Sequence, residues 1–303
     1  MLGRIAGAVR FKEPLSFHTS LRIGGPAEFF IVPQDLDDVR YALAFAEQEG
    51  LPVIVIGGGN NMLVADSGIR GVVLKLQGVF ARTEFHGDEA VVGAGVNLGM
   101  FIREAAARGL GGLEWLAGIP ATVGGALAMN VGMQESSMID TGAQIYFLHP
   151  DGTLAEVRAA AGSRMKLPAR GVVLGCRITL SRRPSAQIQK EINQRLKQKK
   201  ASEPFALAAA GYVWKNPAGE TAARLIARAG LGGKRVNNVE ISGKCANLIV
   251  NRGGATASDV LTLMQLTREH VAAKSGVMLE AEIRTFGLEA TPFEARRPEL
   301  VPA

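Results

Sequence analysis

The sequence predicts a soluble globular protein that mixes helices with strands and divides into two or three compact units. The chain has 303 residues, which exceeds the length of one average domain. Hydrophobic residues make up 47% and charged residues 20%, and the 37 glycines are more than an all-helical bundle would tolerate. Helical and strand patterns also alternate along most of the chain.

The apolar spacing predicts each element in turn. Residues 37–50 place Val39, Ala42, Leu43 and Ala46 at helical spacing, and an apolar strand at 51–56 follows. Ser185 is a predicted N-cap for a helix at 186–200, whose basic residues we interpret as a solvated face. The other expected helices are 98–107, 222–229 and 257–274. The other expected strands are 71–76, 89–96, 144–149, 171–180, 246–250 and 277–285.

Charge and cysteine content narrow the class of function. The formal net charge of +6 suits anionic small molecules and nucleic acid equally well, so it does not decide the ligand. No basic stretch is interleaved with aromatic residues to make a base-stacking surface, so we do not expect nucleic-acid binding. Cys176 and Cys245 lack the spacing of a zinc site or a disulfide framework, so we expect no metal. Charges interrupt the apolar start of the chain, and no apolar run reaches about 18 residues. We therefore expect a cytoplasmic protein without a membrane span.

Two tracts of small residues are candidates for a ligand site. Gly57–Asn61 follows an apolar strand, and residues without Cβ let backbone N–H groups converge on a diphosphate. A turn that needs only glycine's conformational freedom is the alternative interpretation. No GxGxxG motif opens a helix here, which argues against a Rossmann site. Gly118–Asn130 is depleted in bulky side chains and is typical of a wall beside a flat cofactor.

Several segments, taken together, resemble one enzyme family. They are PLSFHTSLRIGGPA at 14–27, the glycine loop, the 118–130 tract, AGYVWKNP at 210–217, ANLIVN at 246–251 and LEAEIR at 279–284. In this order they are similar to the motifs of the MurB reductases, the UDP-N-acetylenolpyruvoylglucosamine reductases. The resemblance covers about Pro14 to Gly287, and the absence of an inserted loop is typical of the shorter, second type.

The resemblance implies an α+β fold. A vanillyl-alcohol-oxidase-type (PCMH) FAD-binding domain would consist of two subdomains, 1–76 and 77–184. A C-terminal α+β substrate-binding domain, 185–287, and a tail, 288–303, would follow. It also implies an enzyme of peptidoglycan synthesis, in which NADPH reduces FAD and hydride then passes to the enolpyruvyl ether of UDP-N-acetylglucosamine. Protonation would give UDP-N-acetylmuramate. We expect a monomer.

The resemblance also implies roles for individual residues. Arg164 corresponds to the arginine that stabilises the enolate, and Glu282 to the catalytic glutamate, since an enolate needs a fixed cation and an acid beside it. The substrate-binding residues would be Lys215, Asn216 and Cys245. The cofactor-binding residues would be Arg22, Gly57, Gly58, Gly59, Asn60, Asn61, Gly118, Thr122, Gly124 and Gly125.

This sequence departs from the family pattern at several of these positions. Tyr212 stands where the family usually has a proton-donating Ser or Cys, Ser163 where a Tyr is usual, Cys245 where a His is usual, and Asn60 where a Ser is usual. Our hypothesis is that Tyr212 has taken over the donor role, because a phenol can protonate an enolate. The alternatives are an inactive paralogue that still binds flavin or nucleotide, a flavin-dependent oxidase, and a nucleotide-binding module without flavin.

Overall fold

The computed structural model describes residues 1–133, 136–158, 167–168, 170–204, 207–288 and 293. The chain forms two compact units. Unit 1 comprises Met1–Glu13, Ala27–Gly58 and Arg70–Ala201, and unit 2 comprises Pro14–Pro26, Gly59–Ile69 and Ser202–Ala303. Units defined by contacts differ from domains defined by function, so the domain boundaries given above stay a prediction.

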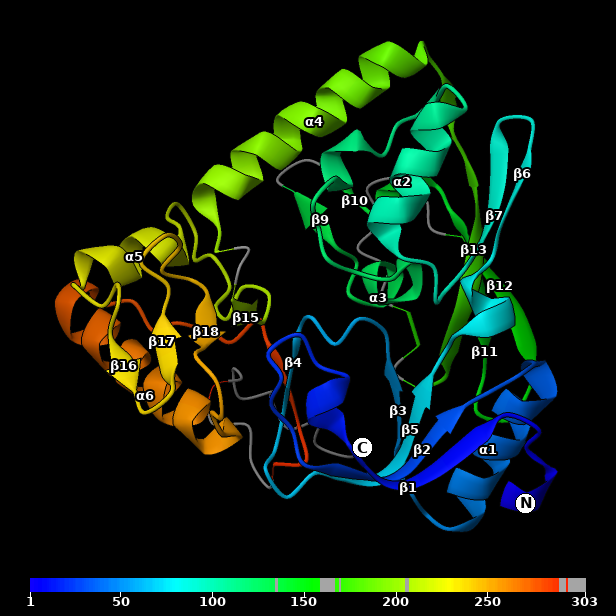
Figure 1. Cartoon of the computed structure of the whole chain (residues 1–303), viewed down its shortest axis with the longest axis horizontal. Helices are drawn as coiled ribbons and strands as arrows, with labels where there is room; N and C mark the ends of the chain where they lie inside the picture. Colours follow the sequence, from blue (N-terminus) through cyan, green and yellow to red (C-terminus); the bar gives the residue numbers. More distant parts are fainter. Residues whose placement is uncertain (134–135, 159–166, 169, 205–206, 289–292, 294–303) are drawn as a thin grey trace, which may run out of the picture. The chain divides into compact units, whose positions relative to one another are not determined.

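The first sheet of unit 1 has four strands. Their order is β1 (Ala8–Pro14), β2 (Pro26–Val32), β5 (Ile69–Lys75) and β3 (Val53–Ile56), and β3 is parallel to β5. Helix α1 (Leu36–Gln48) begins where the Asp35 side chain accepts a hydrogen bond from the Asp38 backbone. The helix buries the four apolar residues predicted for it. Figure 1 shows α1 beside the strands of this sheet. The alternation of this helix with β3 and β5 confirms the helix-to-strand pattern predicted from the sequence.

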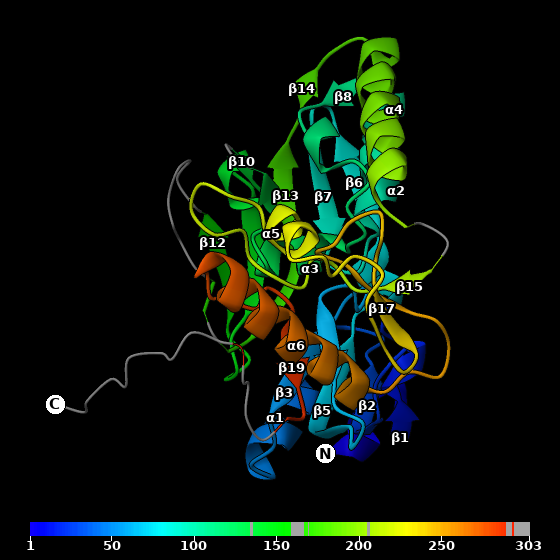
Figure 2. The ribbon, with the colours of Figure 1, turned by 90° about the vertical axis from the view of Figure 1, so that its left-hand side faces the viewer.

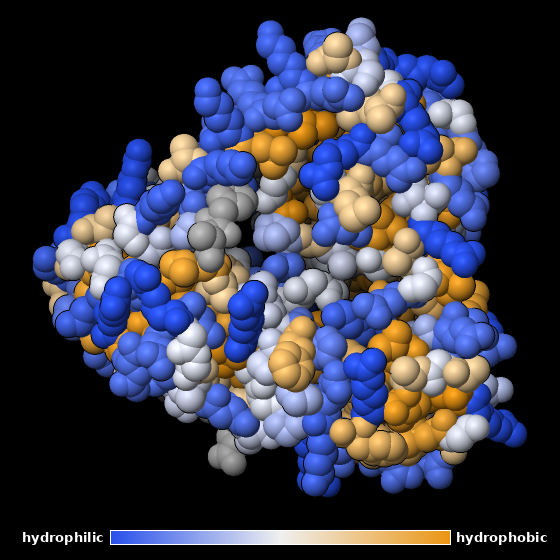
Figure 3. Space-filling view, viewed as in Figure 1, coloured by the Kyte–Doolittle hydropathy of each residue, from blue (hydrophilic) through white to orange (hydrophobic). Residues whose placement is uncertain are grey.

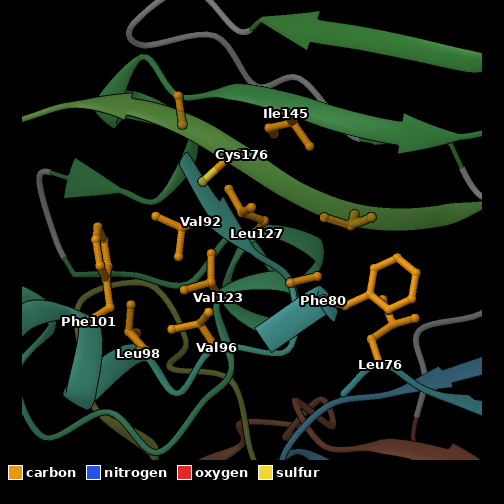
Figure 4. Packing of buried hydrophobic residues seen from close by; sticks show 14 of the residues in the cluster. Leu76, Phe80, Val92, Val96, Leu98, Phe101, Val123, Leu127, Ile145 and Cys176 are labelled. Atoms are coloured by element: carbon orange, nitrogen blue, oxygen red, sulfur yellow. The ribbon is translucent and has the colours of Figure 1, made fainter. Parts of the chain in front are cut away.

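The second sheet of unit 1 is antiparallel and has five strands. Their order is β12 (Leu154–Arg158), β11 (Gln144–Leu148), β13 (Val172–Thr179), β7 (Glu89–Gly93) and β6 (Thr83–His86). Helices α2 (Leu98–Ala107) and α3 (Val123–Ala128) contribute to the core beside it. Figure 4 shows Val92, Val123 and Leu127 gathered near Cys176. Burial raises the pKa of the Cys176 thiol to about 12, so this cysteine is an inert core residue.

Helix α4 (Ser185–Ser202) and several shorter elements complete unit 1. β8 (Leu110–Gly111) pairs with β14 (Ser181–Arg182), close to the start of α4, as Figure 2 shows. Helix α4 buries Ile188 and Ile192, and hydrophilic residues predominate along its outer edge (Figure 3). The predicted N-cap Ser185 is instead the first helical residue, because the Pro184 carbonyl accepts from the Ile188 backbone. The others are β9 (Gly132–Met133), β10 (Ser136–Ser137) and the 3-10 helices Leu2–Arg4, Gly78–Ala81, Glu114–Leu116 and Ile139–Thr141.

Unit 2 is built around a small antiparallel sheet and two helices. The strand order is β15 (Ala208–Ala209), β18 (Ile249–Asn251), β17 (Val239–Ile241) and β16 (Arg235–Val236). Helices α5 (Ala222–Arg228) and α6 (Ala257–Ser275) supply much of its apolar core. The early part of the chain contributes Leu21, Ile23 and Leu63 to this core, and the 3-10 helix Leu15–Phe17 precedes them.

Two predicted strands of unit 2 are wrong for most of their length. The strand predicted at 246–250 is present only from Ile249, as part of β18. The sequence predicted a strand at 277–285, but the structure has only β19 (Arg284–Phe286), which pairs in parallel with β4 (Met62–Val64). Before β19, the backbone of Glu282 donates to the Val213 carbonyl, and Ala281 forms a single bridge with Trp214. These isolated hydrogen bonds take the place of the regular strand pairing that the prediction implied. Among the described residues, no helix has the length and apolarity needed to cross a membrane.

A buried carboxylate fixes the N-terminal segment of unit 1. Asp38 on α1 is 2% exposed and accepts hydrogen bonds from the backbone N–H groups of Ala6, Gly7 and Gln34, each at 2.8 Å. Burial by itself would raise the pKa of this carboxyl. The three backbone donors outweigh burial, and the pKa is lowered.

We expect Asp38→Ala to lower the free energy of unfolding by about 1–3 kcal/mol at neutral pH, because three backbone donors in partly buried hydrogen bonds lose a charged acceptor. Urea unfolding measures the change. The neighbouring Asp37→Ala is the matched control, since Asp37 is exposed and its ion pair with Arg40 lies at the surface. Equal losses in both variants would contradict the anchoring role.

The same interaction predicts a dependence on pH. The folded-state pKa of Asp38 lies below its unfolded value, so its contribution is complete above the unfolded value. The contribution is lost as the pH falls through the lowered folded pKa. The difference between wild type and Asp38→Ala should therefore narrow at strongly acidic pH.

Candidate functional site

In unit 1, the two predicted small-residue tracts meet at Gly57 and Thr122. Strand β3 ends at Ile56, and a Cβ on Gly57 would lie 2.4 Å from the Thr122 hydroxyl oxygen. The same hydroxyl accepts from the Gly125 backbone at 3.2 Å and begins α3. The structure thus brings three predicted cofactor-binding residues together, and only glycine fits at position 57. Gly58, the next residue, is exposed.

Two other glycines of the second tract serve packing within unit 1. A Cβ on Gly124 would lie 2.6 Å from that of Ala94, and the Gly124 backbone donates to the Ala94 carbonyl. Gly118 has a φ of +87°, and a Cβ there would lie 2.9 Å from the Lys199 side chain on α4. The alternative interpretation, that glycine serves backbone geometry and close packing, therefore accounts for both positions.

In unit 2, Gly59 packs against the segment that carries His18. Gly59 has a φ of +63°, and a Cβ would lie 2.2 Å from the His18 carbonyl oxygen. The Ser20 backbone and hydroxyl both donate to the Gly59 carbonyl, at 3.1 and 3.2 Å. Arg22 follows with a left-handed φ of 55° and an exposed side chain. The loop conformation at Gly59 is consequently fixed by the protein itself.

Asn60 and Asn61 join the glycine loop to two distant segments of unit 2. The Asn60 carbonyl accepts from the Gly211 backbone at 2.5 Å. The Asn61 side-chain amide donates to the Glu282 carbonyl at 3.2 Å, and the Asn61 carbonyl accepts from the Arg284 backbone. The loop is thereby hydrogen-bonded both to the segment that carries Tyr212 and to the segment that carries Glu282.

The segments of Tyr212 and Glu282 are also bonded to each other. The Val213 carbonyl accepts from the Glu282 backbone at 2.8 Å, and the Lys215 backbone donates to the Glu280 carbonyl at 2.9 Å. The Lys215 ammonium lies 3.4 Å from the Glu280 carboxylate. The structure therefore places three predicted site residues, Tyr212, Lys215 and Glu282, on two segments that are hydrogen-bonded to each other.

Asn247 is a residue that the sequence prediction did not single out. Its side chain accepts from the Trp214 backbone at 2.9 Å and donates to the Trp214 carbonyl at 2.8 Å, and Asn247 is buried. It therefore fixes the segment that carries Tyr212 and Lys215. A lone amide among the apolar residues of 246–250 was the available signal.

The Tyr212 side chain has an acidic partner. Its hydroxyl donates to a carboxylate oxygen of Glu203 at 3.2 Å, and the side chain is 49% exposed. Partial burial, followed by the charges of Glu203 and Cys245, raises the pKa of Tyr212 to about 12. The phenol therefore stays protonated at neutral pH. Sequence analysis gave no signal for Glu203.

The remaining predicted residues have different surroundings. The Asn216 side chain accepts from the Ala222 backbone at 3.0 Å, at the start of α5, and the Cys245 backbone donates to the Ser242 hydroxyl. Arg164 and Ser163 lie outside the described residues. Among the described residues, no cluster of His, Cys, Asp and Glu side chains could hold a metal ion.

Two hollows in unit 1 contain none of the predicted site residues. A cavity of about 390 Å³ lies over the polar side chains of Glu89, Gln144, Glu156, Arg158 and Arg177. A second, of about 290 Å³, is lined by residues around Trp115 and Asp140. Both are separate from the glycine loop.

Two features of the glycine loop fit a dinucleotide such as FAD. Gly58 offers exposed backbone that a side chain would cover. Oδ1 of Asn61 is buried and accepts no hydrogen bond within the described part of the chain. A buried acceptor of this kind is normally satisfied, and the amide and hydroxyl groups of a flavin dinucleotide are suitable donors.

Comparisons with known proteins agree with the family resemblance. Residues 27–158 match the family model for the FAD binding domain, and residues 203–286 match that for the C-terminal domain of UDP-N-acetylenolpyruvoylglucosamine reductase. UDP-N-acetylenolpyruvoylglucosamine reductase 2 of Symbiobacterium thermophilum is 40% identical over 289 residues, 94% of each chain. The reductase of Geobacter metallireducens is 40% identical over 94% of this chain and 96% of its own.

A solved structure is similar over nearly the whole chain. The crystal structure of UDP-N-acetylenolpyruvylglucosamine reductase (MurB) from Thermus caldophilus superposes with a TM-score of 0.80 at 34% identity, covering 92% of this chain and 99% of that one. The α+β fold with a PCMH-type FAD-binding domain, expected from the sequence, is confirmed. By its sequence identity, coverage and fold, this chain belongs to the UDP-N-acetylenolpyruvoylglucosamine reductase family.

Proposed function

We propose that this chain reduces UDP-N-acetylglucosamine enolpyruvate to UDP-N-acetylmuramate, with FAD as bound cofactor and NADPH as reductant. The observation that carries the proposal is the hydrogen-bonded junction in unit 2, where Asn60 and Asn61 meet the segments of Tyr212 and Glu282. The names of the relatives supply the reaction, and the junction supplies residues suited to it. The proposed setting is a cytoplasmic monomer in peptidoglycan synthesis.

FAD, when bound, would carry hydride from NADPH to the outer carbon of the substrate's vinyl group. Negative charge then develops on the carboxylate-bearing fragment, and we assign the guanidinium of Arg164 to stabilise it. Glu282 would supply an acidic group at the same fragment. Tyr212 would pass its hydroxyl proton to the inner vinyl carbon, which completes the lactyl ether.

The remaining predicted residues would bind and orient the two ligands. Backbone groups at Gly57–Asn61, with Thr122 and Gly125, would hold the FAD diphosphate, and Arg22 and the rest of the 118–125 tract would line the cofactor. Lys215 has an exposed ammonium that could attract the anionic substrate, beside Asn216 and Cys245. Each of these assignments is part of the proposal.

The first prediction concerns cofactor binding. We expect Gly58→Val to lose most of its FAD, because a branched side chain would cover the backbone that approaches the diphosphate. The ratio of flavin to protein absorbance in the purified protein measures this, and circular dichroism checks folding. Gly232→Val is the matched control, since nothing lies within 4 Å of a Cβ at Gly232. A folded Gly58→Val with full flavin content would contradict the proposed binding of the FAD diphosphate by Gly57–Asn61.

The second prediction separates the two half-reactions. Arg164→Ala and Glu282→Gln should each slow flavin reoxidation by the substrate about 100- to 1,000-fold, since the cation of Arg164 and the acidic group of Glu282 act only once the enolate forms. Flavin reduction by NADPH should change little. Stopped-flow absorbance follows both steps, with Arg103→Ala, an exposed arginine on α2, as control. A similar slowing of both steps would assign these residues to cofactor binding or folding.

The third prediction concerns the proton donor. Tyr212→Phe should leave flavin reduction intact and slow product formation roughly 100-fold or more, the scale of a lost general acid. Wild-type turnover should show no decline from donor ionisation at pH values well below its pKa of about 12. Tyr41→Phe is the control. Turnover of Tyr212→Phe at the wild-type rate would reassign Tyr212 as part of the pocket wall.

The same measurements distinguish the alternative functions. A protein that purifies with FAD and accepts hydride from NADPH but never reduces the substrate would be the inactive paralogue. Oxygen consumption with an alcohol would indicate an oxidase. Binding of a UDP-sugar by a protein that lacks a flavin spectrum would indicate a nucleotide-binding module.

A further inference from the structure

The proposed donor, Tyr212, needs a side-chain contact that fixes the position of its hydroxyl. A phenol extends several Å farther from the backbone than the serine hydroxyl usual at this position, so its orientation needs its own support. The described contact of the hydroxyl is the hydrogen bond to Glu203, at 3.2 Å, across nine residues of sequence. Glu203 directly follows the end of α4.

The backbone on both sides of Tyr212 is already fixed. The Gly211 N–H donates to the Asn60 carbonyl, and the Val213 N–H donates to the Asn247 carbonyl at 3.0 Å. The position of the hydroxyl therefore depends on the side-chain torsions of a residue that is 49% exposed. A bond at the tip of the ring is the contact best placed to select one of these orientations.

Two titratable groups act on the phenol from two different segments. Glu203 approaches from the segment after α4, and Cys245 from the loop between β17 and β18. After burial, both raise the pKa of Tyr212, because a negative charge beside the ring opposes formation of the phenolate. The carboxylate that accepts the hydrogen bond thus also disfavours ionisation of the phenol.

Resting on the proposed function, we infer that Glu203 is a positioning residue for the proton donor, which holds the Tyr212 hydroxyl in place and affects the reaction only through Tyr212. In the protonation step the hydroxyl hydrogen turns from Glu203 toward the substrate. The O–H bond breaks as a C–H bond forms at the inner vinyl carbon. The tyrosinate then recovers a proton from solvent, while the hydride comes from NADPH through FAD.

The kinetic test uses the FAD-loaded full-length enzyme in single turnover with the enolpyruvyl substrate. Glu203→Ala should slow flavin reoxidation roughly 10-fold, the scale of a misplaced catalytic group, and leave reduction by NADPH unchanged. Glu203→Gln should recover most of the loss, because its amide oxygen still accepts the hydrogen bond. Glu269→Ala, an exposed glutamate on α6, is the matched control. A wild-type rate in Glu203→Ala overturns the inference.

A double-mutant cycle tests whether Glu203 acts through Tyr212. In the Tyr212→Phe background, Glu203→Ala should cause no further slowing, because the hydroxyl that it positions is absent. Slowing by the same factor in both backgrounds would mean that Glu203 supports the fold or another group, and would overturn the inference.

A spectroscopic measurement tests the contact without relying on turnover. The chain has three tyrosines, so labelling tyrosine with 13C at Cζ gives a small set of signals, and Tyr212→Phe identifies the one from Tyr212. Glu203→Ala should shift that signal and lower the pKa of Tyr212 from about 12 toward its ordinary value. If the signal does not move, the inference about Glu203 is overturned and the proposed function is unaffected. A wild-type holoenzyme that cannot reduce the substrate overturns the proposed function, and with it the catalytic role of Glu203, even where the signal moves.

Discussion

The hydrogen bonds of Asn61 are the constraint on which the arrangement of unit 2 depends. Its amide donates to the Glu282 carbonyl across 221 residues of sequence, and its own carbonyl accepts from the Arg284 backbone. The next residue, Met62, begins β4, which pairs with β19. Asn60 bonds in turn to the segment of Tyr212. A short loop therefore sets the relative positions of the proposed proton donor and the proposed acid, although neither lies near it in sequence.

This arrangement leaves one polar atom without a partner. Oδ1 of Asn61 is buried and unpaired within the described residues, and an unsatisfied buried acceptor costs about 1–3 kcal/mol. The part of the loop that lies in unit 2 has little freedom to relieve this cost, because Gly59 lies against the His18 carbonyl. A rigid loop with an unmet acceptor is preorganised, so a ligand that supplies a donor there gains affinity without first ordering the backbone.

Local patterns in the sequence were sufficient for much of the fold and for part of the candidate site. Helices α1, α2 and α6 follow their apolar spacing closely, and the motif resemblance identified the family. The strand predicted at 277–285 was wrong because its partners, Val213 and Asn61, are distant in sequence and bond to it irregularly. Glu203 and Asn247 were missed for a related reason: each matters through side-chain hydrogen bonds that form only in the folded chain, and neither belongs to a periodic pattern.

The segmented make-up of unit 2 has a consequence for the order in which the protein is completed during synthesis. Unit 1 has all its residues once the chain has been made to Ala201, whereas Pro14–Pro26 and Gly59–Ile69 need partners from the last third of the chain. At 5–20 residues per second, Asn61 waits about 10–40 s for Glu282 to be added. Throughout that interval the edge of β4 lacks its β19 partner. An unpaired strand edge is open to mispairing and to chaperone binding, and this edge directly follows the proposed cofactor loop.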